Sequence, residues 1–192
     1  MSALADSHLV SPSATIGFLG HVGTFSEQAL LSQPDLAAAQ RREFASFVDL
    51  LFAVQNGEVD YGFVAMENAI EGTVNITADT LTFDVDLLIQ REVVLPIEMT
   101  LMAKPGTRLA DVHTVSSYPH AYAQCREWLR EQLPNATFEP ATSTAGAAEA
   151  AARPESAGVA AIANRRAAEV YDLDVIGVDI ADHGDNATRF VL

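Results

Sequence analysis

The sequence predicts an α/β fold built in two blocks, and three observations support that prediction. Short apolar, strand-like runs alternate along the chain with longer helix-like segments. Polar clusters follow directly after two of the apolar runs, at residues 20–27 and 67–73, and ligands of open α/β sheets gather at such strand ends. Leu95 and Pro96 mark the seam between the two blocks.

In the first block, Thr15–Leu19 has the composition of a buried strand. Thr24 and Glu27 have capping-box spacing, which predicts a helix of about two to three turns. Ser46 begins a second helix with one apolar face, and Gly57 ends it. A strand at residues 61–64, a helix at 74–81 and a strand at 87–94 are expected to follow.

In the second block, Pro119 suits the first turn of a helix that runs to about residue 133. Ser143 caps an alanine-rich helix that ends before Pro154, and Asn164 begins another helix. Strands are expected at residues 97–103, 112–115, 159–162, 175–180 and, returning to the first block, 188–192.

Composition and charge limit the classes of function. The 192 residues carry a formal net charge of −15, which argues against nucleic acid or an anionic membrane as a partner. The single cysteine, Cys125, excludes an internal disulfide and fits a reducing cytoplasm. No apolar run reaches the roughly 18 to 20 residues of a transmembrane helix. No His, Cys, Asp and Glu spacing is typical of a metal site.

Six segments in order along the chain resemble the catalytic domain of prephenate dehydratases. They are GHVGTFSE (20–27), ENAIEGTVN (67–75), SYPHAYAQC (117–125), STA (143–145), AIAN (161–164) and DNATRF (185–190). The resemblance implies a two-lobed fold like that of periplasmic binding proteins, with the active site in the cleft between the lobes. It also implies a cytoplasmic homodimer or homotetramer that uses no cofactor and converts prephenate to phenylpyruvate with loss of water and carbon dioxide.

The resemblance also sets the expected domains. Residues 1–14 are interpreted as a disordered arm, residues 15–95 with 186–192 as lobe 1, and residues 96–185 as lobe 2. The regulatory ACT domain that usually follows in the family is not expected here, so phenylalanine should leave the activity unaffected. The chain departs from the usual family pattern at His21, Ala65, Ala69 and His120.

Three residues are expected to be catalytic. Thr188 would donate a hydrogen bond to the departing hydroxyl, and Asn68 would hold that hydroxyl or a carboxylate without adding charge. Arg189 would clamp a substrate carboxylate, or would instead pair with an acid such as Asp185. Because successive strand residues point to opposite faces, a regular strand cannot turn both Thr188 and Arg189 toward the same site.

A second set of residues is expected to bind the substrate. Thr24 and Ser143 lie at helix starts, where backbone N–H groups attract an anion. Phe190 would wall the ring pocket or belong to the core. The complete set is Thr24, Thr73, Gln124, Ser143, Thr144, Asn164 and Phe190. An anion held by helix starts of both lobes would draw the lobes together.

Three other functions remain open from the sequence. An arogenate dehydratase would act on the amine in place of the keto group, and sequence barely separates the two. A prephenate decarboxylase that does not aromatise its product is less compatible with the Thr188-Arg189-Phe190 triplet. A binding module for a small anion without turnover belongs to another class, because a fold alone does not determine function.

Overall fold

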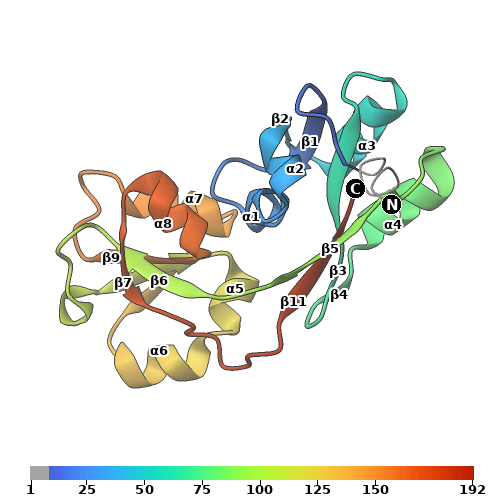
Figure 1. Cartoon of the computed structure of the whole chain (residues 1–192). Coiled ribbons are helices and arrows are strands. Elements are labelled where there is room, and N and C mark those ends of the chain that lie inside the picture. The colour runs from blue at the N-terminus through green and yellow to red at the C-terminus, as the bar shows by residue number, and fades with distance from the viewer. Residues whose placement is uncertain (1–8) are drawn as a thin grey trace, which may run out of the picture. The chain divides into compact units, whose positions relative to one another are not determined.

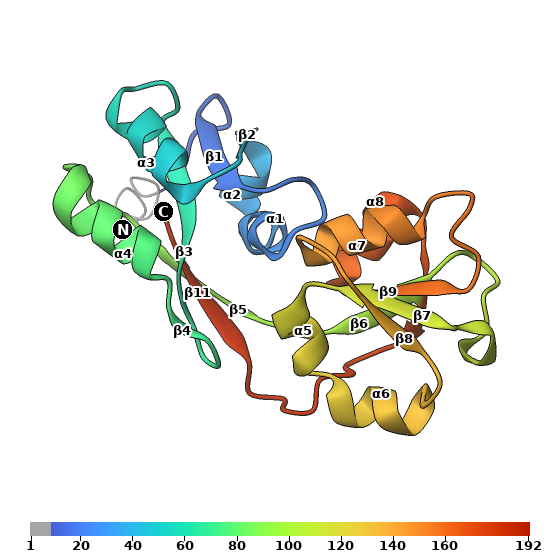
Figure 2. The same ribbon diagram turned by 180° about the vertical axis from the view of Figure 1, so that it is seen from behind.

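The computed structural model of the chain describes residues 9–192, which divide by their contacts into two compact units. The first unit comprises residues 9–21, 26–95 and 187–192, and the second comprises residues 22–25 and 96–186. Figures 1 and 2 show the elements of each unit. No helix within residues 9–192 combines the length and the hydropathy that crossing a bilayer requires.

The sheet of the first unit has the strand order β2-β1-β3-β11-β5, with β4 paired to β3. β1 runs parallel to β2 and β3, whereas β11, the last strand of the chain, pairs antiparallel with β3. The strands are β1 (Thr15–Leu19), β2 (Gln40–Phe44), β3 (Tyr61–Asn68), β4 (Gly72–Thr73), β5 (Glu92–Pro96) and β11 (Ala187–Val191). The helices are α1 (Phe25–Leu31), α2 (Pro34–Ala38), α3 (Phe47–Gln55), α4 (Asn75–Asp79) and the π-helical turn η2 (Thr80–Asp84).

Two glycines allow α3 to pack closely on this sheet. A Cβ atom at Gly17 of β1 would overlap the side chain of Leu50, and one at Gly62 of β3 would lie 3.0 Å from Val54. Leu50 is fully buried. Ser46 accepts a hydrogen bond from a backbone N–H of the first turn and caps α3, as its sequence position predicts. The helix therefore fixes β1 and β3 side by side, and the polar segment after β3 starts from a rigid strand.

The sheet of the second unit has the order β10-β6-β9-β7-β8. β7 is parallel to β8 and β9, and β6 is antiparallel to β9 and β10. The strands are β6 (Thr100–Ala103), β7 (Thr114–Ser117), β8 (Thr137–Pro140), β9 (Val159–Ala163) and β10 (Asp174–Gly177). The helices are η3 (Leu109–Asp111), α5 (Pro119–Ala123), α6 (Arg126–Gln132), α7 (Thr144–Ala151) and α8 (Arg165–Tyr171).

Helices cover both faces of the second sheet. α7 and α8 lie over one face and α6 lies over the other (Figures 1 and 2). The core between α7 and the sheet consists mostly of alanine, with Ala147 and Ala148 against Ala161 and Ala163. Small side chains on both surfaces bring the helix close to the strands, so the start of α7 is held firmly at the end of the sheet.

The sequence patterns missed both strands that border the sheets beside β1 and β7. β2 has the sequence QRREF and is mostly exposed, and β8 has the sequence TFEP. An edge strand needs less apolar surface than a central one, so neither shows the alternation that identifies a half-buried strand. The short elements α2 and β4 were not expected either.

The single helix predicted from Pro119 to about residue 133 is wrong. The chain forms α5 and then α6, with a break at Gln124 and Cys125. The carboxylate of Asp182 accepts backbone N–H groups of Glu127 and Trp128 at 3.0–3.2 Å and so caps the start of α6. The cap comes from a residue more than 50 positions away, which local periodicity cannot reveal.

The chain before β1 is anchored from Val10 onward, although the sequence suggested an arm up to residue 14; residues 1–8 lie outside the described part. Val10 is buried, and its N–H donates to the carboxylate of Asp35 at 3.0 Å. Arg91 donates two hydrogen bonds to the same carboxylate, at 2.8 and 2.9 Å. This bidentate pair joins α2 to the segment before β5 and lowers the pKa of Asp35 from 3.8 to about 2.

The Asp35–Arg91 pair predicts an acid-dependent loss of stability. Because the folded-state pKa of Asp35 is below its unfolded value, the stabilisation is complete above about pH 4 and is lost as pH falls toward 2. Asp35→Asn should lower the free energy of unfolding at pH 7 by at most about 2 kcal/mol, and the difference from wild type should shrink at acid pH.

Urea unfolding between pH 2.5 and 7 measures this difference. Asp111→Asn is the matched control, because Asp111 also pairs with an arginine, Arg108, but on an exposed surface. An Asp35→Asn deficit that stays constant across this pH range would contradict the assignment.

Candidate functional site

The pairing of β11 with β3 brings two parts of the predicted site together. Thr188 lies opposite Asn68 and Arg189 lies opposite Glu67. Figure 1 shows β11, in red, running beside β3. Thr188 is 9% exposed. The end of β3 and the start of β11 therefore form one polar cluster in the first unit. Its residues Asn68 and Thr188 are 120 positions apart in the sequence.

The side chain of Asn68 is held in one orientation. Its Oδ1 accepts the backbone N–H groups of Ile70 and Glu71, each at 3.0 Å. The amide nitrogen therefore faces β11, where it donates to Oγ1 of Thr188 at 2.8 Å and to the carbonyl oxygen of Ala187 at 3.4 Å. Since Thr188 Oγ1 accepts this bond, its own O–H is left to donate elsewhere. The oxygen of Asn68 thus fixes the turn that follows it, and its amide nitrogen fixes the hydroxyl of Thr188.

Arg189 lies between two carboxylates of neighbouring strands. It donates to Glu67 of β3 at 2.9 Å and to Glu92 of β5 at 3.2 Å. The hydrogen bond to Glu92, and to a smaller extent the one to Glu67, raises the pKa of the Arg189 guanidinium. The ion-pair alternative thus describes this structure, but the partners are Glu67 and Glu92 and not Asp185.

Phe190 belongs to the core of the first unit. Its ring is 2% exposed and stacks on Phe63, with ring centroids 5.2 Å apart and planes 7° apart. The register of β3 and β11 shifts between Arg189 and Phe190, because Phe190 faces Ala65 and Met66 is left over as a bulge. The core alternative for Phe190 therefore describes its side chain in this structure.

Two other predicted residues of the site differ in their surroundings. Thr73 is exposed on β4 and lies opposite Glu67, so it belongs to the same cluster as Asn68. Thr24 lies just before α1, but its segment, residues 22–25, clusters with the second unit. Gly23 has a positive φ of 84°, and a Cβ atom added there would lie 3.4 Å from the backbone of Ala167 on α8, so a side chain would be strained.

The second unit gathers polar residues at the carboxyl ends of its parallel strands. Asn164 follows β9 and caps α8, with its Oδ1 accepting the N–H of Ala167 at 2.8 Å. Ser143 follows β8 and caps α7 by accepting the N–H of Gly146, and Thr144 is the first residue of that helix. These are the strand ends at which ligands of α/β sheets bind.

Asn164 carries an unsatisfied donor. The residue is 1% exposed, and its Nδ2 has no hydrogen-bond partner in the described structure. An unpaired buried donor costs about 1–3 kcal/mol. An anion or carbonyl at the ends of β7 and β9 would remove that cost, so Asn164 has more support as a ligand-binding residue than its sequence position alone provides.

Gln124 is occupied by a structural contact. Its Oε1 accepts a hydrogen bond from Nδ2 of Asn186 at 2.9 Å, and its backbone carbonyl accepts the N–H of Asp182. Ser117, the last residue of β7, is fully buried, and its hydroxyl donates to the carbonyl of Ile162.

Side chains with acid–base or nucleophilic chemistry add little to this cluster. Burial raises the pKa of the Cys125 thiol to about 12, and the carboxylate of Asp182 adds to the rise, so the thiol is not a nucleophile at neutral pH. His21 is exposed and pairs with Glu43 at 3.0 Å. Among residues 9–192, no three His, Cys, Asp or Glu side chains converge in a way that would hold a metal ion.

The chain is similar to proteins of one enzyme family. A family model described as prephenate dehydratase matches residues 16–192. The prephenate dehydratase of Bacillus subtilis (strain 168) is 36% identical over 179 residues, covering 92% of this chain and 62% of that protein. The crystal structure of prephenate dehydratase from Arthrobacter aurescens, in complex with L-Phe, is 39% identical with a TM-score of 0.85, over 92% of this chain and 58% of that one.

A more distant likeness concerns the fold alone. A Bacillus subtilis protein classed as a methionine-binding lipoprotein is 14% identical, with a TM-score of 0.50 over 94% of this chain and 83% of that chain. Together with the two sheets, these likenesses confirm the predicted two-lobed α/β fold class. The chain spans about three-fifths of the length of the prephenate dehydratases that it matches.

Proposed function

The chain belongs to the prephenate dehydratase family, and from that premise we propose that it removes water and carbon dioxide from prephenate to give phenylpyruvate. The observation that carries the proposal is the 2.8 Å hydrogen bond from Asn68 to Thr188. It leaves the Thr188 hydroxyl as a donor at a fixed position, and an oriented donor is what this reaction needs from a protein.

The chemistry requires little beyond that donor. Loss of carbon dioxide breaks the carbon–carbon bond to the ring carboxylate, and its electron pair enters the ring. The C4–O bond breaks as the ring becomes aromatic, and the departing hydroxide takes up a proton from solvent to become water. Thr188 stabilises the charge that develops on the departing oxygen by hydrogen bonding, since a threonine hydroxyl is too weak an acid to be the net proton source. Asn68 acts as a positioning residue.

We also assign anion binding to the polar group of the second unit, taken by itself. The unpaired Nδ2 of Asn164 is a neutral donor, and the first N–H groups of α7, beside Ser143 and Thr144, add the positive end of a helix dipole. Arg189 is assigned to strand positioning, because two carboxylates already occupy its guanidinium. The proposed activity belongs to phenylalanine biosynthesis, and we propose that the chain acts as a cytoplasmic homodimer or homotetramer.

Incubation of the purified chain with prephenate at neutral pH tests the activity. Phenylpyruvate is measured by its absorbance in base, and a parallel reaction with arogenate measures the preference for keto acid over amine. Absence of phenylpyruvate under these conditions, with the chain folded, would sink the proposal. A faster reaction with arogenate would favour the arogenate dehydratase alternative.

Thr188→Val should lower kcat by roughly 10²-fold or more, the scale for loss of one oriented donor, with little change in KM. Thr188 is almost buried, and valine keeps its shape while removing the hydroxyl. Thr188→Ser, which keeps the hydroxyl, is the matched control and should retain most of the activity. Steady-state kinetics with prephenate measure both variants, and equal activities of the two would remove Thr188 from the mechanism.

Asn68→Asp should also lower kcat by roughly 10²-fold at neutral pH. An ionised aspartate can still accept the N–H groups of Ile70 and Glu71, but it has no proton to donate. The Thr188 hydroxyl would then donate to it and would be lost to the substrate.

The pH profile distinguishes this effect from a structural one. Activity of Asn68→Asp relative to wild type should rise as pH falls and the new carboxyl takes up a proton. Asn135→Asp, at an exposed position, introduces the same charge and should behave like wild type. A flat ratio of variant to wild-type activity would argue against control of the Thr188 proton by Asn68.

Arg189→Gln should leave KM for prephenate within about twofold of wild type and should lower the melting temperature slightly, because exposed ion pairs contribute little stability. Steady-state kinetics and thermal unfolding by circular dichroism measure the two effects. A KM increase of about tenfold or more would instead show that Arg189 leaves Glu67 and Glu92 to bind a substrate carboxylate.

A further inference from the structure

The second unit contains a hollow that the proposed reaction does not use. It has a volume of about 510 Å³ and lies beside α6, on the sheet face opposite α7. Its size is in the range of small-molecule sites. Thr188, Asn68, Ser143 and Asn164 do not line it, so its ligand chemistry is independent of the proposed activity.

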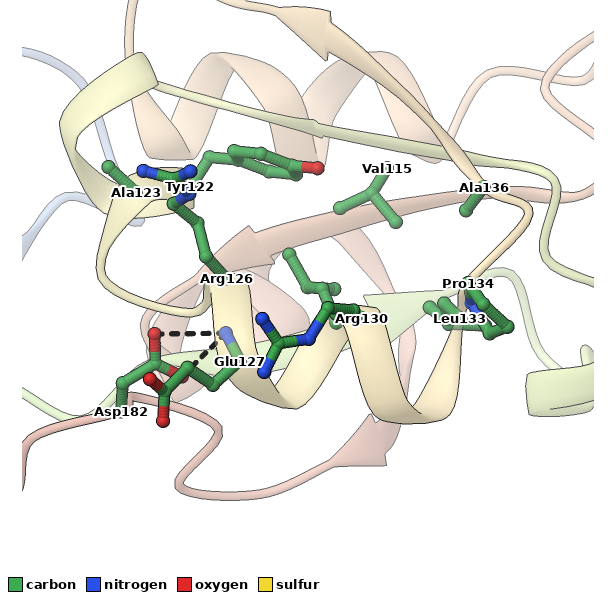
Figure 3. A pocket seen from close by; sticks show the side chains of 11 residues that line it. Val115, Tyr122, Ala123, Arg126, Glu127, Arg130, Leu133, Pro134, Ala136 and Asp182 are labelled. Carbon is green, nitrogen blue, oxygen red and sulfur yellow. Dashed lines mark hydrogen bonds between the residues drawn. The ribbon is translucent and has the colours of Figure 1, made fainter.

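The two ends of the hollow differ in chemistry. Figure 3 shows Val115, Leu133, Pro134 and Ala136 at one end, where the surface is apolar. The charged residues Arg126, Glu127, Arg130 and Asp182 lie at the other end. Tyr122 borders the hollow, and its ring is held by stacking on Phe138, with the ring centroids 3.9 Å apart. A ligand of matching shape therefore has one charged end and one apolar body.

The guanidinium groups are the part of the charged end that is available to an anion. Arg126 and Arg130 are one helical turn apart, and both are exposed. Within residues 9–192, the arginine ion pairs are formed by Arg42, Arg91, Arg108, Arg166 and Arg189. Arg126, which extends from α6 toward Tyr122 in Figure 3, and Arg130 form none of these pairs.

The acids at the same end limit the charge of the ligand. Asp182 is engaged with the start of α6, because its carboxylate accepts the N–H groups of Glu127 and Trp128. The side chain of Glu127 is exposed beside it. These carboxylates would repel a second negative charge on a ligand, so the charged end of the hollow favours a monoanion.

We propose that this hollow binds a small monocarboxylate with an apolar body, such as a short branched-chain acid. The carboxylate pairs with Arg126 and Arg130, because the planar guanidinium group matches the geometry of a carboxylate. The apolar body lies over Val115, Leu133 and Ala136, where it removes apolar surface from water.

4-Methylpentanoate is a suitable probe, because it has the required charge and body and does not absorb where tryptophan does. The single tryptophan of the chain, Trp128, lies on α6 between two residues that line the hollow. Titration of the full chain, followed by Trp128 fluorescence and by calorimetry, should show saturation with a Kd in the range of roughly 0.1–10 mM. The neutral analogue 4-methylpentanamide should bind about tenfold more weakly or not at all.

Arg126→Gln and Arg130→Gln should each weaken binding of the acid about five- to tenfold, since each removes one charged donor. Arg153→Gln is the matched control: Arg153 is exposed in the same unit, outside the hollow, and the charge change is identical. It should bind as wild type does.

Four outcomes would overturn the proposal: no saturation by the acid, equal affinity for the amide, equal weakening in Arg153→Gln, or full binding in the Arg126→Gln/Arg130→Gln double variant. Binding that survives in the double variant would belong to another site on the chain. All of these results are independent of prephenate turnover, so this proposal and the proposed activity can fail separately.

Discussion

The antiparallel pairing of β11 with β3 is the constraint on which the candidate site of the first unit depends. It inserts the last strand of the chain between β3 and β5 and places Thr188 opposite Asn68. Without this register, the two residues would be unrelated parts of a long chain. The close packing of α3 on β1 and β3, which Gly17 and Gly62 permit, keeps the strand that supports Asn68 rigid. A rigid support is what an oriented hydrogen-bond donor requires.

The alternation of side chains along β11 separates three functions within three successive residues. Thr188 and Phe190 are buried or nearly so, whereas the side chain of Arg189 is 40% exposed. The bulge at Met66 changes the pairing between Arg189 and Phe190 without bringing Arg189 inward. One strand thus presents a hydroxyl to the polar cluster, a guanidinium to the carboxylates of both neighbouring strands, and a ring to the core.

Local sequence signals predicted the elements that are capped by their own neighbours. Ser46, Ser143 and Asn164 cap the helices that they were expected to cap, because each bond spans three residues. The break between α5 and α6 and the partners of Arg189 could not be predicted in this way. Asp182 reaches α6, and Glu67 reaches Arg189, only through the tertiary fold. Acidic residues are interchangeable as partners of an arginine at the sequence level, so the sequence cannot distinguish Glu67 from Asp185 as the partner of Arg189.

The unpaired amide nitrogen of Asn164 explains why the strand ends of the second unit are better evidence of a binding site than the helix starts alone. The Oγ of Ser143 is already occupied by the N–H of Gly146, so this cap is complete without a ligand. Asn164 caps α8 with its oxygen and keeps a buried amide nitrogen without a partner. An apolar group in place of this amide nitrogen would not destabilise the fold, because the nitrogen makes no hydrogen bond that stabilises it. A ligand that accepts this hydrogen bond supplies a physical reason for an asparagine at the end of β9, and a carboxylate, which only accepts, matches it better than a group that must also donate.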